Sequence, residues 1–285
     1  MTGEDRARPE GAAVGPRRPL MAGNWKMNGL GAEGVILAGR VAEGVRDLTM
    51  AGLVDVVVFP PFTILNEVGR AIVGTGVDLG AQNLHWDDKG AFTGEIAAPM
   101  LIETGCRYVI VGHSERRQYF GETDETVRRR VDAALRHGLR PIVCVGETWD
   151  ERQAGRTEER IGRQLRGALA DLATDLTAAT TDVELLVAYE PVWAIGSGRA
   201  AGGRDAQEVA AFIRGLLGEV LGPAKAAQIR ILYGGSVKPE NMGEFAGQPD
   251  VDGALVGGAA LDAPAFVAIT RQAVPSAAAG TRAPW

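Results

Sequence analysis

The 285-residue sequence contains few cysteines and histidines, and none of them has the spacing of a metal or disulfide motif. The two cysteines, Cys106 and Cys144, form no CxxC pair, which argues against a disulfide scaffold or a structural zinc site and favours the reducing cytoplasm. The three histidines, His85, His113 and His137, lack a ligand spacing such as HExxH. We therefore expect no metal site.

Long apolar runs and an excess of positive charge are missing as well. No run approaches the ~18 residues that a membrane-spanning helix needs, and residues 1–19 contain no apolar core of a signal peptide. The 30 Lys and Arg against 36 Asp and Glu give a net charge of −6, so the overall charge does not favour nucleic acid. With 46% hydrophobic residues and a mean hydropathy of −0.01, the composition is that of a globular protein. We expect neither membrane nor nucleic acid as a partner.

The sequence repeats one unit eight times, in which a short, nearly continuous apolar run precedes a segment with helical periodicity. Continuous apolar character is typical of parallel strands that are covered on both faces. Eight such units within one domain predict a (β/α)8 TIM barrel, with an open doubly wound sheet as the competitor. The predicted strands are 20–25, 54–59, 76–81, 108–113, 140–146, 183–190, 229–235 and 251–258. The predicted helices are 31–47, 62–73, 96–105, 123–137, 151–170, 204–221, 238–246 and 263–272.

The two ends of the chain differ in composition from this repeat. Residues 1–19 mix Gly, Pro, Arg and acidic residues, and residues 273–285 are rich in Ala and Pro. Such segments have too few apolar residues to form a core of their own. We therefore expect a flexible N-terminal extension over 1–19, a single catalytic domain over 20–272 and a flexible C-terminal tail over 273–285.

Polar groups follow several of the predicted strands, at the end of an α/β barrel where ligands bind. Asn24 and Lys26 end the first run, His113 the fourth and Glu190 the sixth. A glutamate in dry surroundings can act as a general base. Taken alone, a lone histidine is more often a structural hydrogen-bonding group, and most lysines are solvated. Their convergence on one rim nevertheless indicates a catalytic site.

Glycine pairs end the last two strands, as Gly234-Gly235 before Ser236 and as Gly257-Gly258. Glycines let backbone N–H groups approach an anion, and the loops after strands seven and eight of a barrel frequently hold a phosphate. Tight turns without a ligand are the alternative for each pair. The apolar segment after Glu190, framed by a proline and a Gly-Ser-Gly stretch, could close as a lid or could be an ordinary hydrophobic loop.

Several separated motifs together resemble the triosephosphate isomerase family. They are AGNWKMN (22–28), GAQN (80–83), GAFTGE (90–95), GHSERR (112–117), CVGE (144–147), YEPVWAIGSG (189–198), YGGSV (233–237) and GALVGG (253–258). The resemblance extends from about residue 20 to residue 272. It implies an intramolecular oxidoreductase of the aldose-ketose isomerase type, without cofactor or metal, acting in glycolysis and gluconeogenesis.

The resemblance also implies a role for each matching residue. Glu190 would be the base that moves a proton between two carbons of dihydroxyacetone phosphate, giving D-glyceraldehyde 3-phosphate through an enediol(ate). His113 would polarise the carbonyl as a neutral imidazole. Lys26 and Asn24 would stabilise negative charge, and Glu115 would interact with the lysine. The backbone N–H groups of four residues would bind the phosphate: Gly196, Ser236, Gly257 and Gly258.

Two loops carry further expectations from the same resemblance. The lid would comprise 191–199, where Ser197 and Arg199 replace the Thr and Lys that are more usual in the family. The loop 82–95 places aromatic residues in a polar segment, which suggests an interface, and the family pattern implies a homodimer in which Thr93 contacts the partner. Folding of this loop back onto its own barrel is the alternative.

Two other functions remain open at this stage. A paralogous isomerase for a tetrulose phosphate would use the same base and lysine. A noncatalytic sugar-phosphate binder would keep the fold, but it would have no need of the base Glu190 and its lid.

Overall fold

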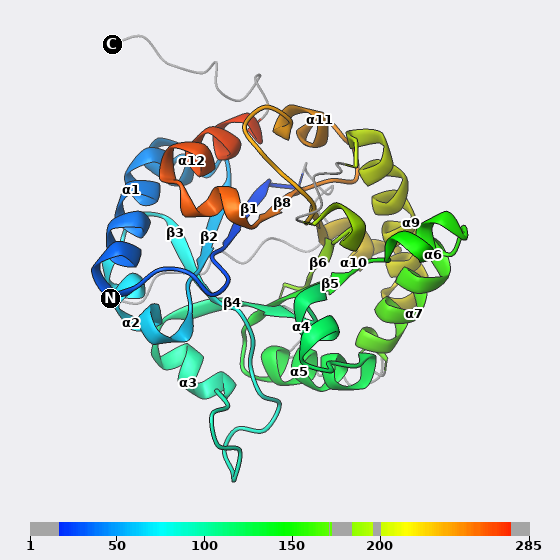
Figure 1. The fold of residues 1–285 in the computed structure, drawn as a ribbon, viewed down its shortest axis with the longest axis horizontal. Coiled ribbons are helices and arrows are strands. Elements are labelled where there is room, and N and C mark those ends of the chain that lie inside the picture. Colours follow the sequence, from blue (N-terminus) through cyan, green and yellow to red (C-terminus); the bar gives the residue numbers. More distant parts are fainter. Residues whose placement is uncertain (1–16, 171, 173–183, 196–200, 275–285) are drawn as a thin grey trace.

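The computed structural model describes residues 17–170, 172, 184–195 and 201–274. Eight parallel strands form a closed barrel in sequence order, with β1 paired to both β2 and β8 (Figure 1). The expected (β/α)8 barrel is therefore confirmed, and the open sheet is excluded. The strands are β1 (Leu20–Asn24), β2 (Asp55–Phe59), β3 (Val77–Ala81), β4 (Cys106–Val111), β5 (Arg140–Val145), β6 (Leu186–Tyr189), β7 (Arg230–Tyr233) and β8 (Gly253–Val256).

Helices surround the barrel as an outer ring (Figure 1). The α-helices are α1 (Gly31–Met50), α2 (Leu65–Ala71), α3 (Ala98–Glu103), α4 (Ser114–Tyr119), α5 (Asp124–Arg136), α6 (Trp149–Gln153), α7 (Thr157–Leu169), α9 (Gly203–Leu221), α10 (Pro223–Gln228), α11 (Met242–Ala246) and α12 (Ala263–Gln272). Short 3₁₀ turns occur at η1 (Phe62–Ile64), η2 (Val192–Ala194) and η3 (Gly258–Leu261).

The helix predicted over 151–170 is wrong in one respect, because the structure has two helices there, α6 and α7. Gly155 lies between them with φ +67°, a left-handed conformation that ends a helix. Helix α9 ends at Gly222-Pro223, and Pro223 then starts α10, where its missing N–H costs no helical hydrogen bond. The six-residue helices α4 and α10 were not predicted.

The core has two layers that explain the continuous apolar runs. On β2, Val57 and Phe59 point into the barrel interior, while Val56 and Val58 belong to the cluster between the strands and the helices. The interior cluster also contains Leu20, Ala22, Tyr108, Ile110, Ile142, Cys144, Leu186, Ala188, Leu232 and Leu255. Neither face of the strands meets water, as parallel sheets require.

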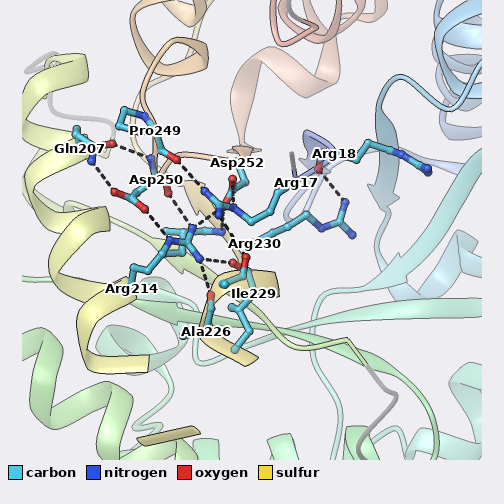
Figure 2. A network of polar contacts seen from close by, with 12 residues as sticks. Arg17, Arg18, Gln207, Arg214, Ala226, Ile229, Arg230, Pro249, Asp250 and Asp252 are labelled. Carbon is cyan, nitrogen blue, oxygen red and sulfur yellow. Dashed lines mark hydrogen bonds and ion pairs between the residues drawn. The ribbon is translucent and has the colours of Figure 1, made fainter. Parts of the chain in front are cut away.

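Ion pairs cover the N-terminal end of the barrel, where the strands begin (Figure 2). Asp252 precedes β8 and meets Arg17 at 2.6 Å and Arg214 at 2.9 Å, and Arg214 also binds Asp250 at 2.7 Å. Arg17 belongs to the segment expected as an extension. Its side chain donates to two backbone carbonyls as well, which holds this part of the segment against the barrel.

A second group of charges completes this end. Arg230, the first residue of β7, pairs with Glu184 and with Asp55, each at 2.6 Å. Asp55 also accepts from Arg18 at 2.9 Å. These paired charges cover the N-terminal end of the barrel, so a ligand site is expected at the opposite, C-terminal end.

Candidate active site

A cavity of about 620 Å³ lies at the C-terminal ends of the strands. Residues predicted from distant parts of the sequence line it together: Asn24, Lys26, His113, Glu115, Glu190, Ser236, Gly257 and Gly258. The barrel brings them together because all parallel strands end at the same rim. Gly196 falls outside the residues that the structure describes, as do Ser197 and Arg199 of the expected lid.

Lys26 follows β1 in a left-handed backbone conformation, with φ +53°. This conformation costs a non-glycine residue on the order of 1 to 3 kcal/mol, so neighbouring contacts must impose it. The Asn24 side chain accepts the Lys26 N–H at 3.0 Å, and the Gln82 amide donates to the Lys26 carbonyl at 2.8 Å. Lys26 Nζ then lies 2.5 Å from Glu115 Oε1. Sequence reasoning named Asn24, Lys26 and Glu115 but missed Gln82, because its contact is to the backbone.

His113 stands at the N-cap of α4, and the helix fixes its tautomer. The ring atom Nδ1 accepts the backbone N–H of Glu115 at 3.2 Å. An accepting Nδ1 carries no proton, so the proton of the neutral ring is on Nε2. The preceding Gly112 has φ +71°, which a side chain would disfavour. The turn therefore presents an N–H donor to the cavity.

Glu190 directly follows β6 and is buried, with 1% of its surface exposed. Its Oε2 accepts the backbone N–H of Ser114 at 2.8 Å. Its Oε1 lies 3.0 Å from His113 Nε2, within ion-pair distance but without the alignment of a hydrogen bond. Sequence reasoning did not include Ser114 in the site, because a backbone donor leaves no signature in the side-chain pattern.

The two side chains shift each other's pKa in opposite directions. Burial opposes the charged form of both, but their mutual attraction outweighs it. The pKa of Glu190 is therefore below its ordinary value, and the pKa of His113 is above its own. Because Glu190 contributes most to the upward shift of the His113 pKa, movement of that carboxylate towards a substrate would reduce the shift. Burial and the Glu115 N–H would then favour the neutral imidazole.

The two glycine pairs differ in what requires them. A Cβ on Gly235 would lie 2.1 Å from the Tyr233 hydroxyl, and one on Gly234 would lie 2.8 Å from Glu190 Cγ. Close packing alone therefore explains this pair, which is the tight-turn alternative. A Cβ on Gly258 would meet nothing within 4 Å, and one on Gly257 would face Lys26 Cε at 3.4 Å. This second pair borders the cavity beside the lysine and suits an anion.

The first half of the expected lid is described, and it is tied to the barrel. The indole N–H of Trp193 in η2 donates to Glu147 Oε1 at 2.9 Å, and the Tyr189 hydroxyl donates to the same oxygen at 3.1 Å. Glu147 is fully buried beside the end of β5. Sequence reasoning quoted it within CVGE without assigning it a role. Its carboxylate anchors the segment that follows Glu190 at the end of β6.

The loop 82–95 projects from the barrel between β3 and α3 (Figure 1), and its two aromatic residues differ. Trp86 lies under Arg129 and Arg130 of α5, with guanidinium carbons 4.1 and 4.9 Å from the ring centre. Trp86 therefore packs against helix α5 of the same chain. Phe92 stays 43% exposed, and Thr93 is exposed too.

The described residues include no group of three or more His, Cys, Asp or Glu side chains arranged to hold a metal ion. Within the same described segments, no helix is both long enough and apolar enough to cross a membrane.

Comparison with known proteins identifies the family. A sequence model described as triosephosphate isomerase matches residues 19–273. The triosephosphate isomerase of Moorella thermoacetica is 56% identical over 253 residues, covering 89% of this chain and 98% of that protein. That of Herpetosiphon aurantiacus is 52% identical, covering 90% and 99%. The crystal structure of the enzyme from Bartonella henselae superposes with a TM-score of 0.78 at 41% identity, covering 90% and 98%. The chain belongs to the triosephosphate isomerase family.

Proposed function

We propose that Glu190, His113, Lys26 and Asn24 carry out the family's isomerase reaction in this chain. The substrates are dihydroxyacetone phosphate and D-glyceraldehyde 3-phosphate. The observation that carries the assignment of residues is the approach of Glu190 to His113, 3.0 Å apart, in a cavity that also contains Lys26. A base, a proton donor and a fixed positive charge are the three groups that enolisation of a phosphorylated ketone needs.

The proton transfers use Glu190 and His113 in turn. Glu190 removes a proton from C1 of dihydroxyacetone phosphate, while the Nε2–H of His113 binds the carbonyl oxygen and donates to it as negative charge develops. The resulting enediol(ate) receives the proton from Glu190 at C2, and the hydroxyl at C1 returns its proton through His113. The reaction balances without an external oxidant or reductant, because C1 is oxidised as C2 is reduced.

Lys26 and Asn24 contribute electrostatically. The ammonium of Lys26 faces developing negative charge and the phosphate, and the contact with Glu115 orients it. Removing one donor from such a preorganised site typically slows turnover by about 10² to 10³-fold. We assign phosphate binding to the backbone N–H groups of four residues, one of them outside the described segments: Gly196, Ser236, Gly257 and Gly258.

We further propose that two copies of the chain form a homodimer. Apolar side chains are exposed next to the active site, with Met27 94% and Leu30 76% exposed directly after Lys26. The loop 82–95 adds Phe92, and Thr93 would contact the partner. The proposal includes a catalytic domain over 20–272 between segments 1–19 and 273–285, a place in glycolysis and gluconeogenesis, and a cytoplasmic location.

A coupled assay tests the reaction directly. Glyceraldehyde 3-phosphate is supplied, and dihydroxyacetone phosphate is detected through an NADH-dependent glycerol 3-phosphate dehydrogenase, with no metal added. We expect full turnover in the presence of a chelator. Activity at background would overturn the proposal. Rates on a four-carbon ketose phosphate, measured in parallel, would test the tetrulose alternative, which no observation in the structure favours.

A further inference from the structure

The turn that carries His113 is held from behind by an arginine outside the substrate cavity. Arg117, on α4, donates from Nε to the Gly112 carbonyl at 2.9 Å and from Nη1 to Asp124 Oδ1 at 2.6 Å. Its side chain is only 11% exposed. Arg117 is absent from the lining of the 620 Å³ cavity and instead borders a neighbouring cavity of about 280 Å³.

The position of the Gly112 carbonyl makes this contact relevant to catalysis. The carbonyl belongs to the peptide plane that joins Gly112 to His113, so a bond to its oxygen restrains the plane from which the imidazole projects. Gly112 has φ +71° and no side chain of its own to limit rotation. The restraint on this peptide must therefore come from its surroundings, and Arg117 supplies it.

Asp124 gives the arginine a fixed point. It is the first residue of α5, directly after the N-cap Thr123, whose capping box with Thr126 defines the helix start. The guanidinium thus spans from the beginning of α5 to the peptide before His113. Its rigid planar fork sets both bonds at once, which a flexible lysine ammonium cannot reproduce.

We propose that Arg117 is a positioning residue for His113, acting through the Gly112–His113 peptide, an inference that rests on the proposed role of His113. Because Arg117 does not line the substrate cavity, its loss affects the transition state more than substrate binding. Misplacement of a reacting group by about 1 Å can cost on the order of 10² in rate. We expect kcat of Arg117→Met to fall roughly 10 to 10²-fold with KM near the wild-type value, and Arg117→Lys to recover part of the loss.

The experiment compares these variants with Asp124→Asn and with Arg214→Lys. Asp124→Asn keeps the arginine but weakens its anchor, so kcat should fall less. Arg214 is a matched control, because it also joins a carboxylate to backbone carbonyls, those of Ala226 and Ile229, but at the opposite end of the barrel. Thermal unfolding is measured for every variant. If Arg117→Met does not fold, the lysine and asparagine variants carry the test.

A spectroscopic signature separates positioning from general loss of stability. The ring nitrogens of His113 are observed by ¹⁵N NMR, with the resonances assigned by their disappearance in His113→Gln. We expect displaced His113 resonances in the Arg117 variants and unchanged ones in Arg214→Lys. Unchanged kcat or unchanged His113 resonances in Arg117→Met and Arg117→Lys would overturn the inference while leaving the proposed function standing. Full activity of His113→Gln would overturn both.

Discussion

The two ends of the barrel treat their charged groups differently. At the N-terminal end, Asp252 meets two guanidinium groups and a backbone N–H, so that its buried carboxylate is fully paired. At the C-terminal end, Oε1 of Glu190 has an ion-pair neighbour but no aligned hydrogen bond, and Lys26 holds a left-handed backbone conformation. The charged groups at the N-terminal end are paired with one another and stabilise the fold. Those at the C-terminal end keep free hydrogen-bonding capacity for a ligand. One chain can combine a stabilising end with a ligand-binding end because the length of the strands separates the two.

Replacing the base should produce the largest contrast between the ends. Glu190→Gln removes the proton acceptor, and kcat should fall by about 10³ to 10⁴-fold. The unfolding midpoint should fall only slightly, because His113 favours the charged form of Glu190 over the opposing effect of burial. The matched control is Glu184→Gln at the N-terminal end, which should leave kcat unchanged. A loss below tenfold in Glu190→Gln, measured in the coupled assay, would contradict the assignment.

Removing an ion pair at the N-terminal end should lower stability and leave turnover unchanged. Arg214→Met leaves Asp250 without its guanidinium partner and Asp252 with only Arg17, so unfolding free energy should fall by about 3 kcal/mol. Denaturant titration measures this change, and kcat/KM of the remaining folded protein should equal the wild-type value. Reduced kcat/KM with unchanged stability would show that the two ends are not independent.

A change on the phosphate side of the cavity should act on binding. Gly257→Asp places a carboxylate near Lys26, where we expect the substrate phosphate, and KM should rise about 10²-fold through like-charge repulsion. Gly257→Ala is the control, since its Cβ would lie 3.4 Å from Lys26 Cε, an ordinary contact. Steady-state kinetics of both variants test this. Equal KM values would place the phosphate elsewhere.

The smallest effect should appear in the pH profile. The acid limb of kcat/KM reports ionisation of Glu190 in the free enzyme. His113 lowers that pKa against the opposing effect of burial, so in His113→Gln the limb should move to higher pH. His137→Gln, which removes a half-buried partner of Asp88, should leave the limb in place. A shift to lower pH would contradict the coupling of Glu190 to His113.

The sequence predicted those features that depend on its periodicity and on the topology of a barrel. Apolar runs located all eight strands, and the rule that ligand groups follow parallel strands brought Asn24, His113 and Glu190 to one rim. Contacts that involve the backbone could not be predicted in this way. Gln82 binds the Lys26 carbonyl across 56 positions, and Ser114 donates its N–H to Glu190 across 76. Neither contact requires a recognisable motif.

Short elements were missed for a different physical reason. The six residues of α4 complete fewer than two turns, which is too short for an apolar stripe to show in the sequence. This helix nevertheless supplies the Glu115 N–H that sets the tautomer of His113. The division of 151–170 had a visible signal in Gly155, but a single glycine within a helical pattern is often tolerated.

The loop 82–95 has a consequence for how two copies would meet. Trp86 already packs against the arginines of α5. The His85 ring packs against both Trp86 and Phe92, with ring centroids 4.3 and 4.2 Å away. A segment that is shaped within the single chain has little conformational freedom left to lose on association. In the proposed homodimer, this loop would dock with a conformation already set by contacts within its own chain.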